Sequence, residues 1–306
     1  MRRVAAVDIG TNSTLLLIAE DTGQGRRVLV DRSTITRLGQ GVDATGQFSP
    51  SAAECTLACL TDYAGEIRRA AVSRVAAVGT SALRDARDAG SFVAAASSAL
   101  GAPVRVIDGA EEARLTFLGG LGGLAVEGSV TVFDVGGGST EIIRGIAGPQ
   151  RVGVRETASL DVGSVRLTER HVRDDPPSPT AVESMRAQVR AALKAAPRPA
   201  PGGQVVALGG TATTLVCIDR RLVVYDSSQV HGATLPVTGL LRLATHLSGL
   251  STTERRALPG LEPARADVIC AGAWILVELC AWSRADALLV SDRGVRWGLV
   301  EELGSG

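Results

Sequence analysis

The sequence predicts an α/β protein made of two similar halves, and three observations support this fold class. Stretches typical of strands alternate with stretches typical of helices along the chain. The length of 306 residues suggests about two domains. One short motif occurs twice, as DIGTNST from residue 8 and as DVGGGST from residue 134. Each copy follows one apolar run and precedes another, which predicts a strand, a turn of small residues and a second strand.

The first half is expected to fold as a sheet with helices around it. Ser49 stands before Pro50 at the start of a helical pattern, where it is suited to cap the helix. The expected strands are 3–9, 14–19, 27–36, 74–80 and 104–107, and the expected helices are 51–70, 90–100 and one that opens at 108.

The second half repeats this plan, and a mostly parallel sheet is expected in each half. The boundary is expected in the glycine-rich stretch 119–129, which gives domains 1–122 and 123–292. The expected strands are 129–134, 139–144, 150–157, 204–208 and 287–291, and the expected helices are 163–172, 180–195, 238–248, 264–282 and one from about 293.

Composition excludes several classes of function. Lys and Arg total 32 and Asp and Glu total 32, so no net charge attracts nucleic acid or an acidic membrane. Aromatic residues make up 3% of the chain, too few for a base-stacking surface. No apolar run has the length of a membrane span, and the start of the sequence lacks a signal peptide. We therefore expect a cytoplasmic protein that binds neither nucleic acid nor membrane.

The repeated turn has the composition of a phosphate-binding loop. Gly, Ser, Thr and Asn expose successive backbone N–H groups and let a phosphate approach closely. An Asp at the end of the preceding strand, here Asp8 or Asp134, can hold Mg²⁺. Two ordinary β-hairpins are the alternative. The predicted phosphate-binding residues are Gly10, Thr11, Asn12, Ser13, Gly136, Gly137, Gly138 and Ser139, together with Gly209, Gly210 and Thr211 at a second kind of anion site, the start of a helix after a buried strand.

Three charged residues are candidates for the chemistry. Glu141 replaces the apolar residue of the first copy, and it could join Asp134 in a metal and water site or face solvent. Asp108 and Glu111 fit a capping pair, which leaves Glu112 to activate a water molecule. Arg84 follows a buried strand and could bind phosphate, although an ion pair on a solvated helix is the ordinary alternative.

Several stretches in fixed order resemble the exopolyphosphatase / guanosine pentaphosphate phosphohydrolase family, within the superfamily of actin-like, Hsp70-like and sugar-kinase-like ATPases. They are AAVDIGTNSTLLLIA, GTSALRDA, VIDGAEEARLTFLGG, DVGGGSTEII, SLDVGSVRLTE, ALGGTATTL, PARADVICAGAWIL and SDRGVRWGL. The resemblance implies two actin-like (ribonuclease H-like) domains with an interdomain cleft, the terminal helix 293–306 returning to the first domain. It also implies release of terminal phosphate from polyphosphate or guanosine pentaphosphate with Mg²⁺, or Mn²⁺ in its place. The family's catalytic glutamate matches Glu112 and its phosphate-binding arginine matches Arg84, while its metal-and-phosphate residues match Asp8, Asp134, Gly136, Gly137, Ser139 and Glu141.

The match is not complete, and alternatives stay open. The closing motif usually reads Arg-Glu-Gly, whereas here Trp297 stands in the middle. A kinase of the same superfamily and a binding protein of low turnover are the competing functions, and a homodimer is left open. Six arginines of the second half could line a path for a polyanion, although a scattered solvated surface is the favoured interpretation: Arg144, Arg151, Arg155, Arg166, Arg170 and Arg173.

Overall fold

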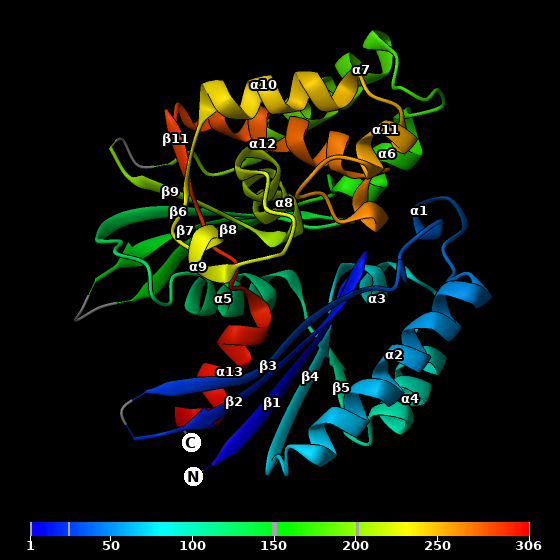
Figure 1. The fold of residues 1–306 in the computed structure, drawn as a ribbon, viewed down its shortest axis with the longest axis vertical. Coiled ribbons are helices and arrows are strands. Elements are labelled where there is room, and N and C mark those ends of the chain that lie inside the picture. Colours follow the sequence, from blue (N-terminus) through cyan, green and yellow to red (C-terminus); the bar gives the residue numbers. More distant parts are fainter. Residues whose placement is uncertain (1, 24, 149–151, 200–201, 306) are drawn as a thin grey trace. The chain divides into compact units, whose positions relative to one another are not determined.

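The computed structural model describes residues 2–23, 25–148, 152–199 and 202–305 (Figure 1). The chain forms two compact units. Unit 1 is Met1–Gly119 with Val295–Gly306, and unit 2 is Gly120–Gly294. None of the helices among the described residues combines the length and the hydrophobicity of a membrane span.

Unit 1 contains a five-stranded mixed sheet in the order β3-β2-β1-β4-β5. β1 pairs antiparallel with β2, β2 pairs antiparallel with β3, and β1–β4 and β4–β5 are parallel pairs. The carboxyl ends of β1, β4 and β5 therefore share one edge of the sheet. The strands are β1 (Arg3–Ile9), β2 (Ser13–Asp21), β3 (Arg26–Ile35), β4 (Arg74–Gly79) and β5 (Val104–Val106).

Helices cover both faces of this sheet. Alternate residues of β1 point to opposite faces, so β1 contributes to one apolar core on each side. Ala5 and Val7 pack in a core with α2 and α4, which lie side by side in Figure 1. Val4 and Ala6 pack in a second core with residues of α5 and α13. The helices are α1 (Val42–Thr45), α2 (Pro50–Arg69), α3 (Ser81–Asp85), α4 (Ala89–Leu100), α5 (Gly109–Gly120) and α13 (Val295–Ser305).

Unit 2 contains a six-stranded sheet in the order β10-β11-β9-β6-β7-β8. β9 lies parallel to β6 and to β11, whereas β6–β7, β7–β8 and β10–β11 are antiparallel pairs. The strands are β6 (Gly128–Val135), β7 (Thr140–Ala147), β8 (Gly153–Leu160), β9 (Gln204–Leu208), β10 (Thr234–Pro236) and β11 (Ala287–Val290).

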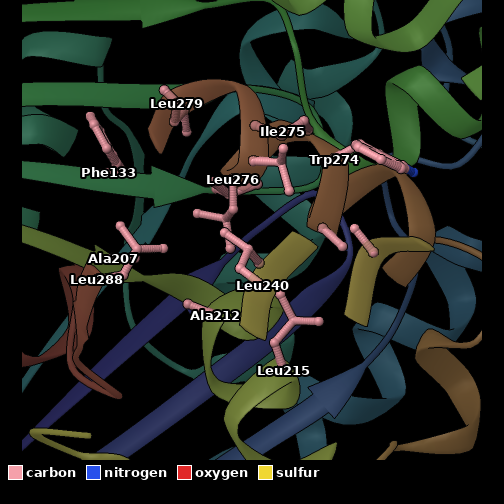
Figure 2. Packing of buried hydrophobic residues seen from close by; sticks show 14 of the residues in the cluster. Phe133, Ala207, Ala212, Leu215, Leu240, Trp274, Ile275, Leu276, Leu279 and Leu288 are labelled. Carbon is pink, nitrogen blue, oxygen red and sulfur yellow. The ribbon is translucent and has the colours of Figure 1, made fainter. Parts of the chain in front are cut away.

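The core of unit 2 is built around α12, which is buried along most of its length. Figure 2 shows Leu276 of this helix next to Leu240 of α10, and Ile275 of the helix belongs to the same core as Phe133 and Ala207 of the sheet. The helices are α6 (Ser164–His171), α7 (Pro179–Ala192), α8 (Gly209–Arg220), α9 (Ser227–Val230), α10 (Val237–Ser248), α11 (Thr252–Arg256) and α12 (Ile269–Ser283), with short 3₁₀ turns at Leu193–Ala195 and Pro263–Arg265.

The expectation of a mostly parallel sheet in each half is wrong. In each unit the first three strands along the chain are separated by only a few residues, and so short a connection can return the chain only antiparallel. The strand expected at 150–157 is β8, which runs three residues further; residues 150 and 151 lie outside the described parts of the chain. The helix expected from 264 is a 3₁₀ turn followed by α12.

Candidate functional site

The two copies of the repeated motif form the same turn. Gly10 N donates to Ser13 O at 3.0 Å, and Gly136 N donates to Ser139 O at 3.0 Å. A Cβ atom added at position 10 would lie 3.1 Å from Ser13 O, and one added at position 136 would lie 3.2 Å from Ser139 O. A side chain at either position would therefore press on the accepting carbonyl, which would have to move by a few tenths of an ångström.

In unit 1, three candidate segments begin at one edge of the sheet. The first loop follows β1, α3 follows β4, and α5 follows β5. In the register of the parallel strands, Ile9 of β1 pairs with Gly79 of β4, and Gly79 pairs with Val106 of β5. This arrangement brings Arg84 of α3 next to Glu112 of α5. Ligands of open α/β sheets bind at such an edge.

Glu112 is buried and pairs with Arg84. Arg84 Nη1 donates to Glu112 Oε2 at 2.6 Å and to Ile107 O at 3.0 Å. Burial raises the pKa of the Glu112 carboxyl above its ordinary value, and the charge and hydrogen bond of Arg84 oppose part of that rise. A carboxylate with a raised pKa is suited to accept a proton near neutral pH.

Glu111 has different surroundings. Its backbone N–H donates to Asp108 Oδ1 at 2.8 Å, which caps the start of α5 as the sequence predicts. Its carboxylate pairs instead with Arg105, at 3.0 Å from Nη2. The helix start therefore depends on the Asp108 side chain and the backbone of residue 111.

The first loop is largely buried. Thr11 and Asn12 are 8% and 7% exposed. Among the described residues, Asn12 Nδ2 has no hydrogen-bond partner. A buried amide donor without a partner is costly, and an oxygen atom of a bound anion would satisfy it.

In unit 2, the residue at which the two copies of the motif differ, Glu141, lies beside the aspartate that both copies share. Asp134 of β6 is directly opposite Glu141 of β7, whereas Asp8 is directly opposite Leu15. Glu141 is buried and accepts a hydrogen bond of 2.9 Å from Ser159 Oγ. Directly opposite residues on antiparallel strands share a face with their Cβ atoms about 4.5–5.5 Å apart. The sheet register therefore sets two carboxylates side by side.

This pair of carboxylates fits a magnesium ion. Mg²⁺ uses one or two protein carboxylates and completes its shell with water and substrate phosphate. A cation would also relieve the repulsion between like charges at opposite positions. Across the described parts of the chain, no group of three or more His, Cys, Asp or Glu side chains is arranged to hold a metal ion. Protein ligands alone would thus leave such an ion incompletely coordinated.

The start of α8 lies against Asp134. A Cβ atom at Gly209 would come within 2.9 Å of Asp134 Oδ1, and one at Gly210 would come within 2.2 Å of Arg265 Nη1. Thr211 follows in the first turn and is buried. Arg265 was not predicted as a site residue from the sequence, although it lies within the stretch PARADVICAGAWIL.

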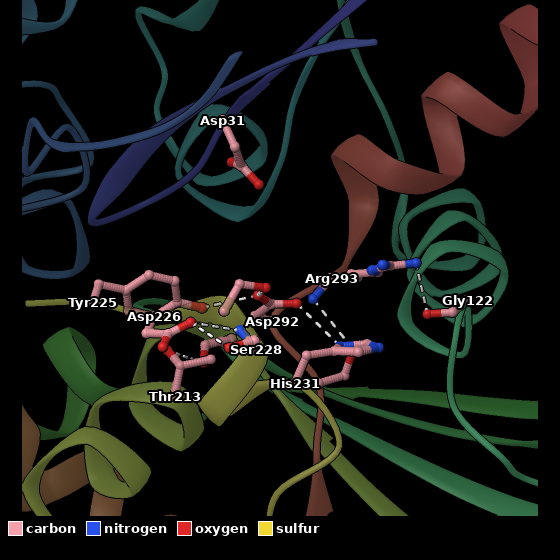
Figure 3. Close-up of polar contacts among 12 residues, drawn as sticks. Asp31, Gly122, Thr213, Tyr225, Asp226, Ser228, His231, Asp292 and Arg293 are labelled. Carbon is pink, nitrogen blue, oxygen red and sulfur yellow. Dashed lines mark hydrogen bonds and ion pairs between the residues drawn. The ribbon is translucent and has the colours of Figure 1, made fainter. Parts of the chain in front are cut away.

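A polar network follows the carboxyl end of β11 (Figure 3). Asp292 Oδ1 lies 3.0 Å from His231 Nδ1, and Asp292 Oδ2 accepts hydrogen bonds from Tyr225 and Ser227. Burial alone would raise the pKa of Asp292, but these hydrogen bonds outweigh it and lower that pKa to about 2. Arg293 Nη1 donates to Gly122 O at 2.8 Å. The network therefore ties the end of β11 to the segment that enters unit 2.

Three of the six arginines considered for a polyanion path have partners within unit 2. Arg144 pairs with Glu156, and Arg173, which follows α6, donates to the carbonyl groups of Glu169 and Arg170 in that helix. Arg166 donates to Gly138 O of the second loop. Arg151 lies outside the described residues.

The candidate residues thus gather within each unit separately. Unit 1 places Arg84 and Glu112 at the edge where the first loop begins. Unit 2 places the second loop, the two carboxylates and the start of α8 at one edge of its sheet. The unit 1 residues are Asp8, Gly10, Thr11, Asn12, Ser13, Arg84 and Glu112, and the unit 2 residues are Asp134, Gly136, Gly137, Gly138, Ser139, Glu141, Gly209, Gly210 and Thr211.

Known proteins resemble this chain over almost its whole length. The model of the Ppx/GppA phosphatase family matches residues 17–304. The sequence is 40% identical to exopolyphosphatase 2 of Mycobacterium tuberculosis, over 99% of both chains. It is 29% identical to a guanosine-5'-triphosphate,3'-diphosphate pyrophosphatase of Vibrio cholerae, over 98% of this chain and 59% of that protein. The solved structure of the Aquifex aeolicus PPX-GPPA enzyme matches with a TM-score of 0.82 and 34% identity, over 98% of this chain and 99% of that one.

Proposed function

Because the chain belongs to the Ppx/GppA phosphatase family, we propose that it is an Mg²⁺-dependent hydrolase that releases terminal phosphate from inorganic polyphosphate or guanosine pentaphosphate. The observation that carries the proposal is the buried Glu112 carboxylate, with its raised pKa and its 2.6 Å contact with Arg84. The names of the relatives support the two substrates, since one is an exopolyphosphatase and another a guanosine-5'-triphosphate,3'-diphosphate pyrophosphatase.

In the proposed reaction, Glu112 accepts a proton from a water molecule as the water oxygen attacks the terminal phosphorus. The bond from that phosphorus to the bridging oxygen breaks, and the shortened chain leaves with the bonding electrons. Glu112 then returns its proton to solvent. Arg84 keeps Glu112 in place, and its remaining N–H groups are suited to phosphate oxygens.

The two loops are assigned to binding. Amide groups of residues 11–13 and 137–139 donate to phosphate oxygens, as does the start of α8 at Gly209 and Gly210. Gly10 and Gly136 contribute by forming the turns. In unit 2, Asp134 and Glu141 would hold Mg²⁺ or Mn²⁺, which supplies positive charge to phosphate oxygens when bound. Asp8 is the equivalent carboxylate of unit 1 and a second candidate metal ligand. The assignment is supported by the matched turns and by the opposite positions of Asp134 and Glu141.

The proposed function is tested by phosphate release from polyphosphate, guanosine pentaphosphate and ATP, measured side by side. We expect release from one or both of the first two with Mg²⁺ and almost none in excess EDTA. Consumption of ATP only in the presence of a phosphate acceptor would identify a kinase instead. Tight binding of all three compounds without release would identify a binding protein.

A further inference from the structure

The carbonyl side of the second loop is held by the start of α6. Ser164 N donates to Gly136 O at 2.9 Å, Val165 N donates to Gly137 O at 2.9 Å, and Arg166 N donates to Gly137 O at 3.1 Å. The first amides of a helix have no partner within the helix. The N-cap residue Gly163 provides no side chain to satisfy them. The loop carbonyls therefore serve as the cap of α6.

The Arg166 side chain extends this contact to a third carbonyl. Its Nε donates to Gly138 O at 2.7 Å from a partly buried position. A hydrogen bond from a guanidinium is stronger than one between neutral groups. Helix and loop also approach too closely for any side chain between them, since a Cβ atom at Gly163 would lie 2.3 Å from Gly137 O.

We propose that Arg166 is a positioning residue that keeps the second loop in the conformation needed to bind phosphate. In a trans peptide unit, the C=O of one residue and the N–H of the next point in opposite directions. Fixing the carbonyls of residues 136, 137 and 138 therefore fixes the amides of 137, 138 and 139 on the side away from α6. The inference rests on the proposed function, because it assigns these amides to a substrate phosphate.

The first loop supports this interpretation, because its carbonyls are held in a similar way. Thr36 N and Arg37 N donate to Asn12 O at 3.1 and 3.0 Å, and Gly39 N donates to Thr11 O at 2.8 Å. In both units the donors come from the segment that follows the third strand of the unit, which is β3 in unit 1 and β8 in unit 2. Both copies thus fix the carbonyls of the turn and leave amides for a ligand.

The test compares Arg166→Gln with Arg173→Gln. Each variant removes one positive charge. Arg166 lies in the first turn of α6, whereas Arg173 lies just after α6 and donates to the Glu169 and Arg170 carbonyls of that helix, not to the loop. Hydrogen exchange of the segment 134–141 is measured without any ligand, and KM and kcat are measured on short polyphosphate with Mg²⁺. Two further variants are measured. Arg166→Lys keeps the charge. Gly163→Ala adds a Cβ atom against Gly137 O of the loop without changing the charge.

We expect faster exchange of the loop in Arg166→Gln and a KM raised about tenfold, the effect of losing one hydrogen bond from a charged group. Its kcat and the pH dependence of its rate should change little, because Glu112 is untouched. Arg166→Lys should recover part of the loss, Gly163→Ala should resemble Arg166→Gln, and Arg173→Gln should stay within about twofold of the original protein.

Equal exchange and equal KM in Arg166→Gln and Arg173→Gln would overturn the inference. If Arg166→Gln fails to fold, Gly163→Ala provides the test instead. Unchanged hydrogen exchange of segment 134–141 in Gly163→Ala would overturn the inference as well. Absence of phosphate release by the original protein would instead contradict the proposed function. The exchange measurement would still show whether Arg166 orders the loop.

Discussion

At the residue scale, Glu111 and Glu112 are neighbours with different tasks. Glu112 is 7% exposed and bonded to Arg84, whereas Glu111 forms a partly exposed pair with Arg105. Glu112→Gln keeps the size of the side chain but removes the base, so kcat should fall by about 10²–10⁴-fold. Glu111→Gln keeps the backbone bond to Asp108, and its stability should change by less than about 1 kcal/mol. Turnover and thermal midpoint of both variants check this, and loss of activity in Glu111→Gln alone would reverse the assignment.

The pH dependence of the rate provides a second test of the same carboxylate. Burial raises the pKa of Glu112, so activity should fall toward acid with a midpoint above the ordinary glutamate value. Arg84 lowers this pKa, and therefore Arg84→Gln should move the midpoint to still higher pH. Arg87→Gln is the control, because Arg87 donates to Thr45 O. The measurement is kcat/KM against pH, and a midpoint in Arg84→Gln equal to that of the control would contradict the role of Glu112.

At the element scale, Asp292 secures the end of β11. Its pKa is lowered to about 2 in the folded protein, against about 3.9 for an ordinary aspartate. The ionised carboxylate therefore contributes stability above about pH 4, and this contribution disappears as pH falls toward 2. Asp292→Asn should lower the free energy of unfolding by about 2 kcal/mol at pH 7.

Urea unfolding from pH 7 to pH 3 measures this contribution. The difference between the original protein and Asp292→Asn should narrow as the solution becomes more acidic. Asp286→Asn, a change at an exposed position before β11, is the control. A difference that stays constant over the whole range would show that ionisation of Asp292 does not stabilise the fold.

Elements with a strong local pattern could be predicted from the sequence. β1 and α12 have an almost continuous apolar pattern. α2 has buried residues along one face, and Ser49 accepts the expected capping bond from Ala52 N at 3.2 Å. Short elements such as β10 and α11 have too few residues to show a period. Their positions depend on pairing with distant segments, as in the match of Leu235 with Leu288.

The candidate site was predictable where the repeat marks it. The repeat itself points to Asp8, Asp134 and the two turns, and the break in the repeat points to Glu141. Arg265 and the contact of Arg166 with the loop have no such local mark. Arg265 lies close to Gly210 although 55 positions separate them in the sequence, and Arg166 contacts Gly138 although 28 positions separate them. Such contacts become visible only when the sheet order and the helix positions are known.

At the scale of the whole molecule, the duplicated motif is the main organising feature. Each unit has an antiparallel hairpin with the same turn, then a third strand whose following segment holds the carbonyls of that turn. The copies differ in chemistry, because Leu15 stands opposite Asp8 and Glu141 stands opposite Asp134. We infer that both copies bind phosphate and that the second also serves the metal ion.

The last prediction follows from this duplication. Gly10→Ala and Gly136→Ala add the same Cβ atom to equivalent turns, 3.1 and 3.2 Å from the accepting carbonyls of Ser13 and Ser139. Each carbonyl must shift, so each variant should raise KM on polyphosphate by roughly fivefold to thirtyfold, equal to about 1–2 kcal/mol of binding. Gly90→Ala and Gly153→Ala are the controls in the two units, because a Cβ atom there meets nothing within 4 Å. If Gly136→Ala raises KM while Gly10→Ala does not, the first turn does not bind phosphate and the symmetry is one of fold only.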